Sequence, residues 1–131
     1  MERNLTRKIK VGNLYVGGDS PITVQSMTNT DTRNVAATVY QIKELEKAGC
    51  DIIRSAVPDL EAARALKDII EQINIPMVAD IHFDYRLALE SVKSGVSALR
   101  INPGNIGSID RVREVAYAAL DKGLPIRIGV N

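Results

Sequence analysis

A short apolar run recurs along this chain, each time after a helical pattern that ends at glycine or proline. Runs of this kind begin at residues 52, 77, 98 and 126, and a further run precedes the first helical pattern. Strands that are apolar at nearly every position are typical of a parallel sheet, because both of its faces are covered. Alternation of such strands with helices restricts the chain to a parallel α/β fold. The predicted strands are residues 22–26, 52–57, 77–80, 98–101 and 126–130.

The segments between these strands are amphipathic, with apolar residues repeated at helical spacing. Each predicted helix therefore has one face that packs against the sheet. The predicted buried residues are Val35, Val39, Ile42 and Leu45 in the first helix, Leu66, Ile69, Ile70 and Ile73 in the second, Tyr85, Ala88, Leu89 and Val92 in the third, and Ile109, Val112, Ala116 and Leu120 in the fourth. Ahead of the first strand, residues 8–11 and 14–16 flank Gly12-Asn13 and predict a β-hairpin.

Two architectures fit this alternation, an open doubly wound sheet and a closed (β/α)8 barrel. The chain has no glycine-rich turn after its first strand, although doubly wound dinucleotide-binding domains carry one there. A closed barrel takes roughly 250 residues, whereas this chain has 131 and ends on a predicted strand. We therefore expect residues 1–131 to form a partial TIM-barrel domain of the α/β class, with an amino-terminal hairpin followed by the first five strands and four helices of an incomplete (β/α)8 barrel.

Charge and composition exclude several classes of protein. Seventeen basic and sixteen acidic side chains give a net charge of +1, whereas general nucleic-acid or membrane-surface proteins carry a large basic excess. No apolar run approaches the roughly 20 residues that span a bilayer, and no hydrophobic stretch follows the charged amino end to suggest a signal peptide. We therefore expect a cytoplasmic protein whose partners include neither nucleic acid nor membranes.

Three arginines, Arg54, Arg100 and Arg127, lie within the predicted strands among apolar neighbours. In parallel α/β folds the functional face lies at the carboxyl ends of the strands. Guanidinium groups that meet at this rim repel one another and lose hydration, so they need an anionic partner. Because arginine presents a fork that matches phosphate oxygens, the three residues predict a phosphate or diphosphate site. Structural pairing with acidic residues remains the alternative for any one of them.

Further polar residues follow the same strands. Asp80 ends the third predicted strand and His82 follows it two positions later, so their side chains are expected on one side of the rim as catalytic candidates. A surface or capping role for His82 stays open. No metal site is predicted, because the single cysteine, Cys50, cannot form a metal cage by itself. The remaining candidates for substrate binding are Ser26, Thr28, Asn29, Asn102 and Asn131.

Four segments carry a resemblance to a known family. They are VQSMTNT (24–30), VADIHFDYR (78–86), LRINPGNIG (99–107) and PIRIGVN (125–131). In their order and spacing they resemble the 4-hydroxy-3-methylbut-2-enyl diphosphate synthases, and the resemblance extends from Lys8 to the last residue. It implies an iron–sulfur oxidoreductase of the non-mevalonate isoprenoid pathway, which opens methylerythritol cyclodiphosphate by a two-electron reduction and dehydration. Ser55 departs from the family pattern, which has an aliphatic residue there, and we expect it to affect packing rather than chemistry.

The resemblance also implies roles for residues and partners. Arg54, Arg100 and Arg127 match positions that hold the diphosphate, Asn102 and Asn131 match their polar neighbours, and Asp80 and His82 match residues near the substrate. The family further implies a [4Fe–4S] cluster in a smaller downstream domain, flavodoxin or ferredoxin as electron donor, and a homodimer. The cluster ligands are expected outside this chain, because it has one cysteine and a cluster takes about four ligands. The chain alone is therefore expected to be inactive.

Two other readings remain open at this point. The first is a pterin-binding transferase barrel of the dihydropteroate synthase kind, which has a similar fold and an anion site but needs no iron. The second is a non-catalytic half-barrel that binds anions and covers its open sheet edges by association.

Overall fold

The structure is a computed structural model that describes residues 8–18 and 23–129. Its elements follow the predicted alternation of strands and helices. In chain order they are β1 (Ile9–Val11), β2 (Leu14–Val16), β3 (Gln25–Met27), α1 (Val35–Lys47), β4 (Ile52–Ala56), α2 (Leu60–Ile70), β5 (Met77–Ile81), α3 (Tyr85–Ser94), β6 (Ala98–Ile101), α4 (Pro103–Ile106), α5 (Ile109–Asp121) and β7 (Ile126–Ile128). Ile22 and Val130, at the ends of two predicted strands, lie outside the described residues.

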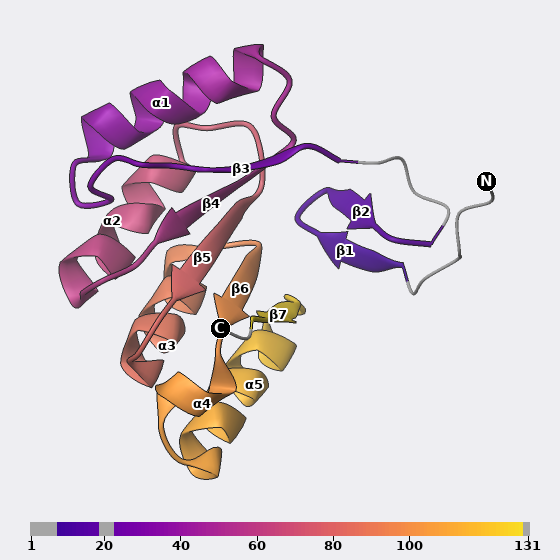
Figure 1. Ribbon diagram of the computed structural model, residues 1–131, viewed down its shortest axis with the longest axis vertical. Coiled ribbons are helices and arrows are strands. Elements are labelled where there is room, and N and C mark those ends of the chain that lie inside the picture. The colour runs from indigo at the N-terminus through magenta and orange to yellow at the C-terminus, as the bar shows by residue number, and fades with distance from the viewer. Residues whose placement is uncertain (1–7, 19–22, 130–131) are drawn as a thin grey trace.

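Strands β3 to β7 form one parallel sheet whose spatial order is the order of the chain. Helices cover one face of this sheet, as Figure 1 shows. Doubly wound sheets reverse their strand order at a switch point, whereas a (β/α)8 barrel adds each strand beside the last. The unreversed order therefore confirms the partial barrel and excludes the doubly wound alternative for the described residues.

The predicted hairpin forms and covers the other face of the sheet. Ile9 pairs with Val16 across the antiparallel strands β1 and β2, which lie on the side of the sheet away from the helices in Figure 1. Val11 and Leu14 pack against apolar residues at the amino ends of β4, β5 and β6. At the turn, Gly12 has a φ of 60°, and a Cβ there would lie 2.9 Å from Pro76. The hairpin thus closes the end of the barrel interior that lies opposite the polar rim.

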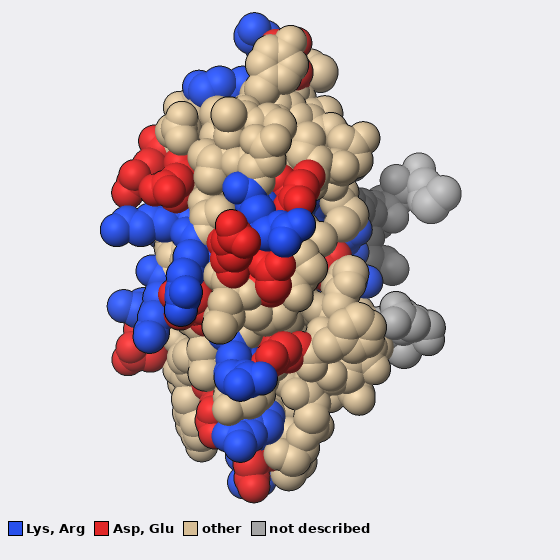
Figure 2. All heavy atoms as spheres, turned by 90° about the vertical axis from the view of Figure 1, so that its left-hand side faces the viewer, with Lys and Arg blue, Asp and Glu red and all other residues tan. Residues whose placement is uncertain are grey.

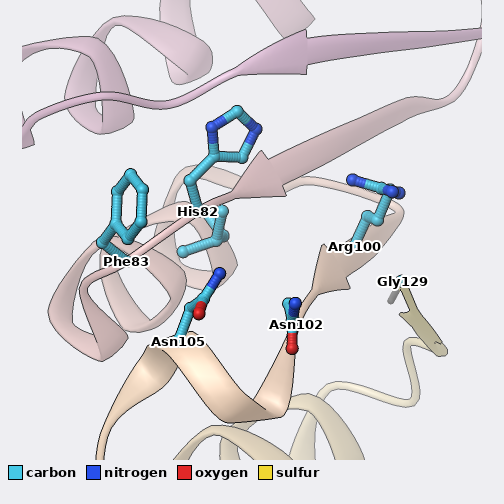
Figure 3. Close-up of a pocket in the computed structure, with 7 residues that line it drawn as sticks. His82, Phe83, Arg100, Asn102, Asn105 and Gly129 are labelled. Atoms are coloured by element: carbon cyan, nitrogen blue, oxygen red, sulfur yellow. The ribbon is translucent and has the colours of Figure 1, made fainter. Parts of the chain in front are cut away.

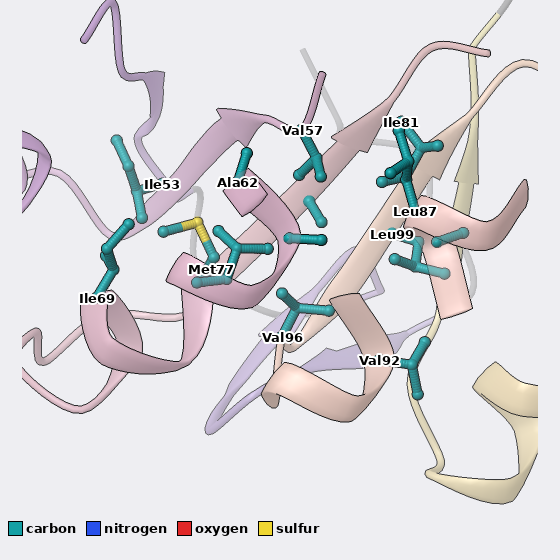
Figure 4. Close-up of a cluster of buried hydrophobic side chains, with 14 of the residues drawn as sticks. Ile53, Val57, Ala62, Ile69, Met77, Ile81, Leu87, Val92, Val96 and Leu99 are labelled. Carbon is teal, nitrogen blue, oxygen red and sulfur yellow. The ribbon is translucent and has the colours of Figure 1, made fainter. Parts of the chain in front are cut away.

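The main core lies between the sheet and the helices. Ile53, Met77 and Leu99 point from the strands toward Leu66 and Val92 on the helices, and Figure 4 shows the interior of this cluster. The predicted faces of the first three helices all contribute to it. Because side chains alternate along each strand, the neighbouring positions Arg54, Asp80 and Arg100 face the opposite, concave side. The same period-2 pattern that builds the core therefore places the polar residues.

The predicted buried face of the fourth long helix is wrong. In α5 the buried residues are Val115 and Ala119, with Val112 packed beside them, whereas Ile109 and Leu120 are 69% and 75% exposed. Two overlapping apolar stripes run along this helix. The stripe with the smaller side chains faces the core, on the side where α5 packs against α3.

One short helix was not predicted. Residues 103–106 form α4, a single turn between β6 and α5. Pro103 occupies its first turn, where a missing N–H costs nothing, and the Asn102 side chain accepts a hydrogen bond from the Gly104 N–H at 3.0 Å. This helix could not be predicted from the sequence, because four residues are too few to show helical periodicity.

Ser55 lies on the helix-covered face of β4 and is fully buried. Its hydroxyl forms a 2.8 Å hydrogen bond with the Thr28 hydroxyl, which is also buried. The residue thus takes part in packing, as expected, and points away from the concave side that carries Arg54. A polar side chain is tolerated here because its partner, directly after the adjacent strand β3, forms a hydrogen bond with it.

Replacing Ser55 with alanine should lower the free energy of unfolding by about 1–3 kcal/mol, because it leaves the buried Thr28 hydroxyl without this partner. The double variant Ser55→Ala with Thr28→Val should recover most of this loss, since both polar groups are then removed. Chemical denaturation of the full-length variants measures both effects. Equal stability of Ser55→Ala and the unmodified protein would contradict the buried hydrogen bond.

The helical surface carries charges of both signs. Figure 2 shows Lys and Arg side chains standing beside Asp and Glu side chains across this face. The ion pairs include Arg33–Asp31, Arg86–Asp84 and Arg111–Glu114.

Within the part of the chain that the structure describes, no helix is long and apolar enough to span a membrane.

Candidate anion site

Asp80 is the centre of a polar cluster on the concave face of the sheet. Its side chain is 3% exposed, and three cationic or potentially cationic groups converge on it. Arg100 Nη1 donates to Oδ1 at 3.1 Å, while Arg54 Nε and His82 Nε2 lie 3.5 and 3.4 Å from Oδ2. The register explains the arrangement, because Asp80 pairs directly with Arg100 across β5 and β6. The structure therefore brings together four residues that the sequence placed in one site.

Arg54 is incompletely paired in this cluster. Its Nε is the buried side-chain nitrogen or oxygen without a hydrogen-bond partner among the described residues, and its Nη2 contacts only the weak acceptor Met27 Sδ, at 3.4 Å. An unsatisfied guanidinium donor costs free energy unless another acceptor completes it. Because Nε is buried and faces Asp80, the donor capacity of Arg54 for a ligand oxygen lies in its Nη groups.

Arg127 extends the cluster from the last strand. It is the register partner of Arg100, and its Nη1 donates to Gln25 Oε1 on β3 at 2.9 Å. In a flat sheet β3 and β7 would lie roughly 19 Å apart, because four strand spacings of about 4.8 Å separate them. Side chains do not bridge that distance, so the contact shows that the sheet curves around its concave face as a barrel wall does.

The charges of this concave face do not balance. Arg54, Arg100 and Arg127 contribute three positive charges, and Asp80 contributes one negative charge, while the hydrogen-bond partner of Arg127 is a neutral amide. An excess of two positive charges on one face, with two of the three arginine side chains largely buried, favours an anionic ligand. A diphosphate group presents several oxygens to such forks.

A pocket of about 100 Å³ opens beside this cluster. Its lining includes His82 and Phe83, which follow β5, and Asn102 and Asn105 of the β6–α4 segment, and Figure 3 shows Arg100 and Gly129 on the side away from Phe83. Phe83 is 73% exposed and contacts the His82 ring edge to face, with 6.1 Å between the ring centres. The pocket therefore combines cationic, amide and aromatic groups at the carboxyl ends of adjacent strands.

The segment after β3 does not join the cluster. Ser26 is the register partner of the core residue Ile53, and Thr28 bonds Ser55, so both side chains belong to the helix-covered face. The exposed Asn29 exchanges hydrogen bonds with the Gln41 side chain of α1, at 2.9 and 2.6 Å. Asn131 lies outside the described residues. A substrate contact by any of these residues stays a prediction.

Four residues of the site were not predicted from the sequence. Phe83, Asn105 and Gly129 line the pocket, and Gln25 binds Arg127. Asn105 could have been predicted from its spacing, because it follows Asn102 by three positions and residues three apart on a helical turn share a side. Gln25 could not be predicted without knowing that the sheet curves, because it contacts Arg127 across the first and last strands of the sheet.

Asp84 orders the segment that carries His82 and Phe83. As the N-cap of α3, its Oδ1 accepts the Arg86 N–H at 2.9 Å. The hydrogen bond from the Arg86 side chain holds the pKa of Asp84 below its ordinary value of 3.8. A carboxyl whose pKa is lowered by folding adds stability above its unfolded-state pKa, and that stability is lost as the pH falls through the lowered value.

Replacing Asp84 with alanine should therefore destabilise the fold by about 1 kcal/mol at pH 7, the usual cost of a lost N-cap. Asp84→Asn should keep most of the stability at pH 7, since asparagine also caps helices. When the pH is lowered from 5 to 2, this variant should lose less stability than the unmodified protein, because it has no carboxyl to protonate at this position. Urea denaturation across this pH range compares the three proteins. A steeper acid loss in Asp84→Asn than in the unmodified protein would contradict the assignment.

The described residues do not fit an iron–sulfur cluster. Cys50 is buried at the junction of α1 and β4, and its thiol donates to the Ile52 carbonyl at 3.1 Å. No group of three or more His, Cys, Asp or Glu side chains in the described residues is placed to hold a metal ion. A [4Fe–4S] cluster takes about four ligands, usually thiolates, and the whole chain has one cysteine.

Comparison with known proteins gives consistent matches. The GcpE TIM-barrel domain matches residues 6–131. The 4-hydroxy-3-methylbut-2-en-1-yl diphosphate synthase (flavodoxin) of Clostridium perfringens is 65% identical over 131 residues, which are 100% of this chain and 38% of that protein. The proteins of the same name from Clostridium acetobutylicum and Ectopseudomonas mendocina are 66% and 63% identical over 100% of this chain, and 38% and 35% of their lengths are covered. The chain thus spans little more than a third of these curated relatives.

Proposed function

This chain belongs to the GcpE TIM-barrel family, and we propose on that basis that it forms the diphosphate-binding part of a 4-hydroxy-3-methylbut-2-en-1-yl diphosphate synthase. The substrate is methylerythritol cyclodiphosphate, whose diphosphate lies against the concave face of the sheet. The observation that carries the proposal is the unbalanced cluster in which Arg54 and Arg100 share the single carboxylate of Asp80, while Arg127, the register partner of Arg100, bonds the neutral amide of Gln25.

Asp80 orients the two arginines that it contacts, so that their remaining donors point to the ligand. Arg100 uses Nη1 for Asp80, and Arg54 places Nε 3.5 Å from the same carboxylate, so that the Nη groups of Arg54 remain for the ligand. Guanidinium groups held in advance lose little freedom when the diphosphate binds, which increases affinity. Asn102 and Asn131 are proposed as further contacts to the substrate.

His82 is proposed as the group that donates a hydrogen bond or a proton to the substrate. Its side chain is 53% exposed and its Nε2 lies 3.4 Å from Asp80 Oδ2. Histidine is suited to this role because its charge changes near neutral pH. Asp80 holds the ring at the mouth of the pocket, beside the position proposed for the diphosphate.

The reduction itself requires groups that these residues do not supply. We propose that a [4Fe–4S] cluster in a further domain provides the electrons, that flavodoxin delivers them, and that the complete protein acts as a cytoplasmic homodimer. The relatives that match over the whole chain carry flavodoxin in their names. A pterin ligand remains as an outcome for the experiment below, and ferredoxin is the alternative electron donor.

Calorimetric titration of the anaerobically prepared full-length protein tests the proposal. Methylerythritol cyclodiphosphate and inorganic diphosphate should both bind, inorganic phosphate should bind more weakly, and affinity should fall with added salt because the contacts are ionic. A pterin that binds while both diphosphates do not would instead support the transferase reading. Binding of neither class would contradict an anion site on this face.

A further inference from the structure

Gly129 lies directly after β7 and beside Arg100 in the pocket (Figure 3). Its N–H donates to the Ile101 carbonyl at 2.8 Å, which fixes the backbone of this residue against the end of β6. A Cβ at this position would lie 2.6 Å from Arg100 Nη2, 2.8 Å from Cζ and 3.1 Å from Nε. The Arg100 guanidinium therefore occupies the volume that any side chain at residue 129 would need.

The backbone conformation at Gly129 does not require glycine. Seven glycines of the described residues have a positive φ, and Gly129 is not among them. An alanine could adopt the same backbone without the strain that left-handed conformations impose. What glycine provides here is space, and the three atoms nearest to that space all belong to Arg100.

The guanidinium of Arg100 is thus held between two strands. On one side Nη1 donates to Asp80 of β5 at 3.1 Å, and on the other side the Gly129 backbone approaches the guanidinium from beyond β7. We propose that Gly129 is a positioning residue of the anion site, because its missing side chain sets where the Arg100 guanidinium lies. That the site binds an anion rests on the proposed function, whereas the contact between Gly129 and Arg100 is independent of it.

The first experiment measures ligand affinity in the full-length protein. Gly129→Ala should weaken the binding of inorganic diphosphate about tenfold, as expected when one charged contact is displaced. The same change in an Arg100→Ala protein should add less than a twofold loss, because the group that it displaces is already gone. Gly104→Ala is the matched control, since a Cβ there would meet Asn102 Oδ1 at an ordinary 3.4 Å.

The second experiment needs no ligand. An alanine that fits a glycine site stabilises a protein by restricting its unfolded chain. Gly129→Ala should therefore raise the melting temperature in the Arg100→Ala protein but lower it, or leave it unchanged, when Arg100 is present. A stabilising effect of equal size in both proteins would overturn the proposal.

The two experiments separate the two claims. If the unmodified protein binds no diphosphate while Gly129→Ala raises the melting temperature only in the Arg100→Ala protein, the proposed function fails and the contact stands. If diphosphate binds and Gly129→Ala weakens it equally with and without Arg100, the positioning role fails and the anion site stands.

Discussion

Replacing Arg100 with alanine in the full-length protein should weaken the binding of methylerythritol cyclodiphosphate by about 2–5 kcal/mol, the range for removing one partner of a desolvated charge pair. Arg54→Ala should give a loss of similar size, because both arginine side chains are about three-quarters buried beside Asp80. Arg127→Ala should fall near the lower limit, since Arg127 is more exposed and already bonds Gln25. Isothermal titration calorimetry measures each loss.

Lysine at position 54 or 100 should restore only part of the affinity, because it cannot donate bidentately to phosphate oxygens. Arg113→Ala is the matched control, as this exposed arginine lies on α5, within the helical layer. Affinity that is unchanged in all three rim variants would remove the basis of the anion site.

Replacing Asp80 with asparagine should lower the free energy of unfolding by about 2–3 kcal/mol. Removing one partner of a fully buried ion pair costs about 3–5 kcal/mol, and a smaller loss is expected here because Arg54 and Arg100 are 25% and 27% exposed. Asparagine preserves the shape of the side chain but leaves both guanidinium groups without a counter-charge. Chemical denaturation of the full-length variant measures the loss.

Asp68→Asn provides the control, because Asp68 is exposed on α2. It should change stability by less than about 0.5 kcal/mol, as for most surface substitutions. If Asp80→Asn were as stable as this control, Asp80 would not be the residue that holds the arginines together.

The strands and most helices could be predicted because their patterns are local. The run at 98–101 coincides with β6, and the runs at 52–57 and 77–80 differ from β4 and β5 by one residue at one end. Burial on both faces makes such runs continuous. The face of α5 could not be predicted in this way, since two stripes compete and the contact with α3 decides between them.

The site could be predicted in part, for a related reason. Period-2 alternation places Arg54, Asp80 and Arg100 on one face once the strands are known, and parallel register then places Asp80 opposite Arg100. Sequence alone does not show that Asp80 serves both arginines and His82, because this depends on side-chain reach. Nor does it show the contact between Gln25 and Arg127, which requires a curved sheet.

A crystal structure of the full-length protein with methylerythritol cyclodiphosphate tests the central claim most directly. We expect diphosphate oxygens within hydrogen-bond distance of the guanidinium groups of Arg54, Arg100 and Arg127, with Asp80 still bound to Arg100. A diphosphate that lies elsewhere, with none of these three arginines in contact, would contradict the assignment of this face as the anion site.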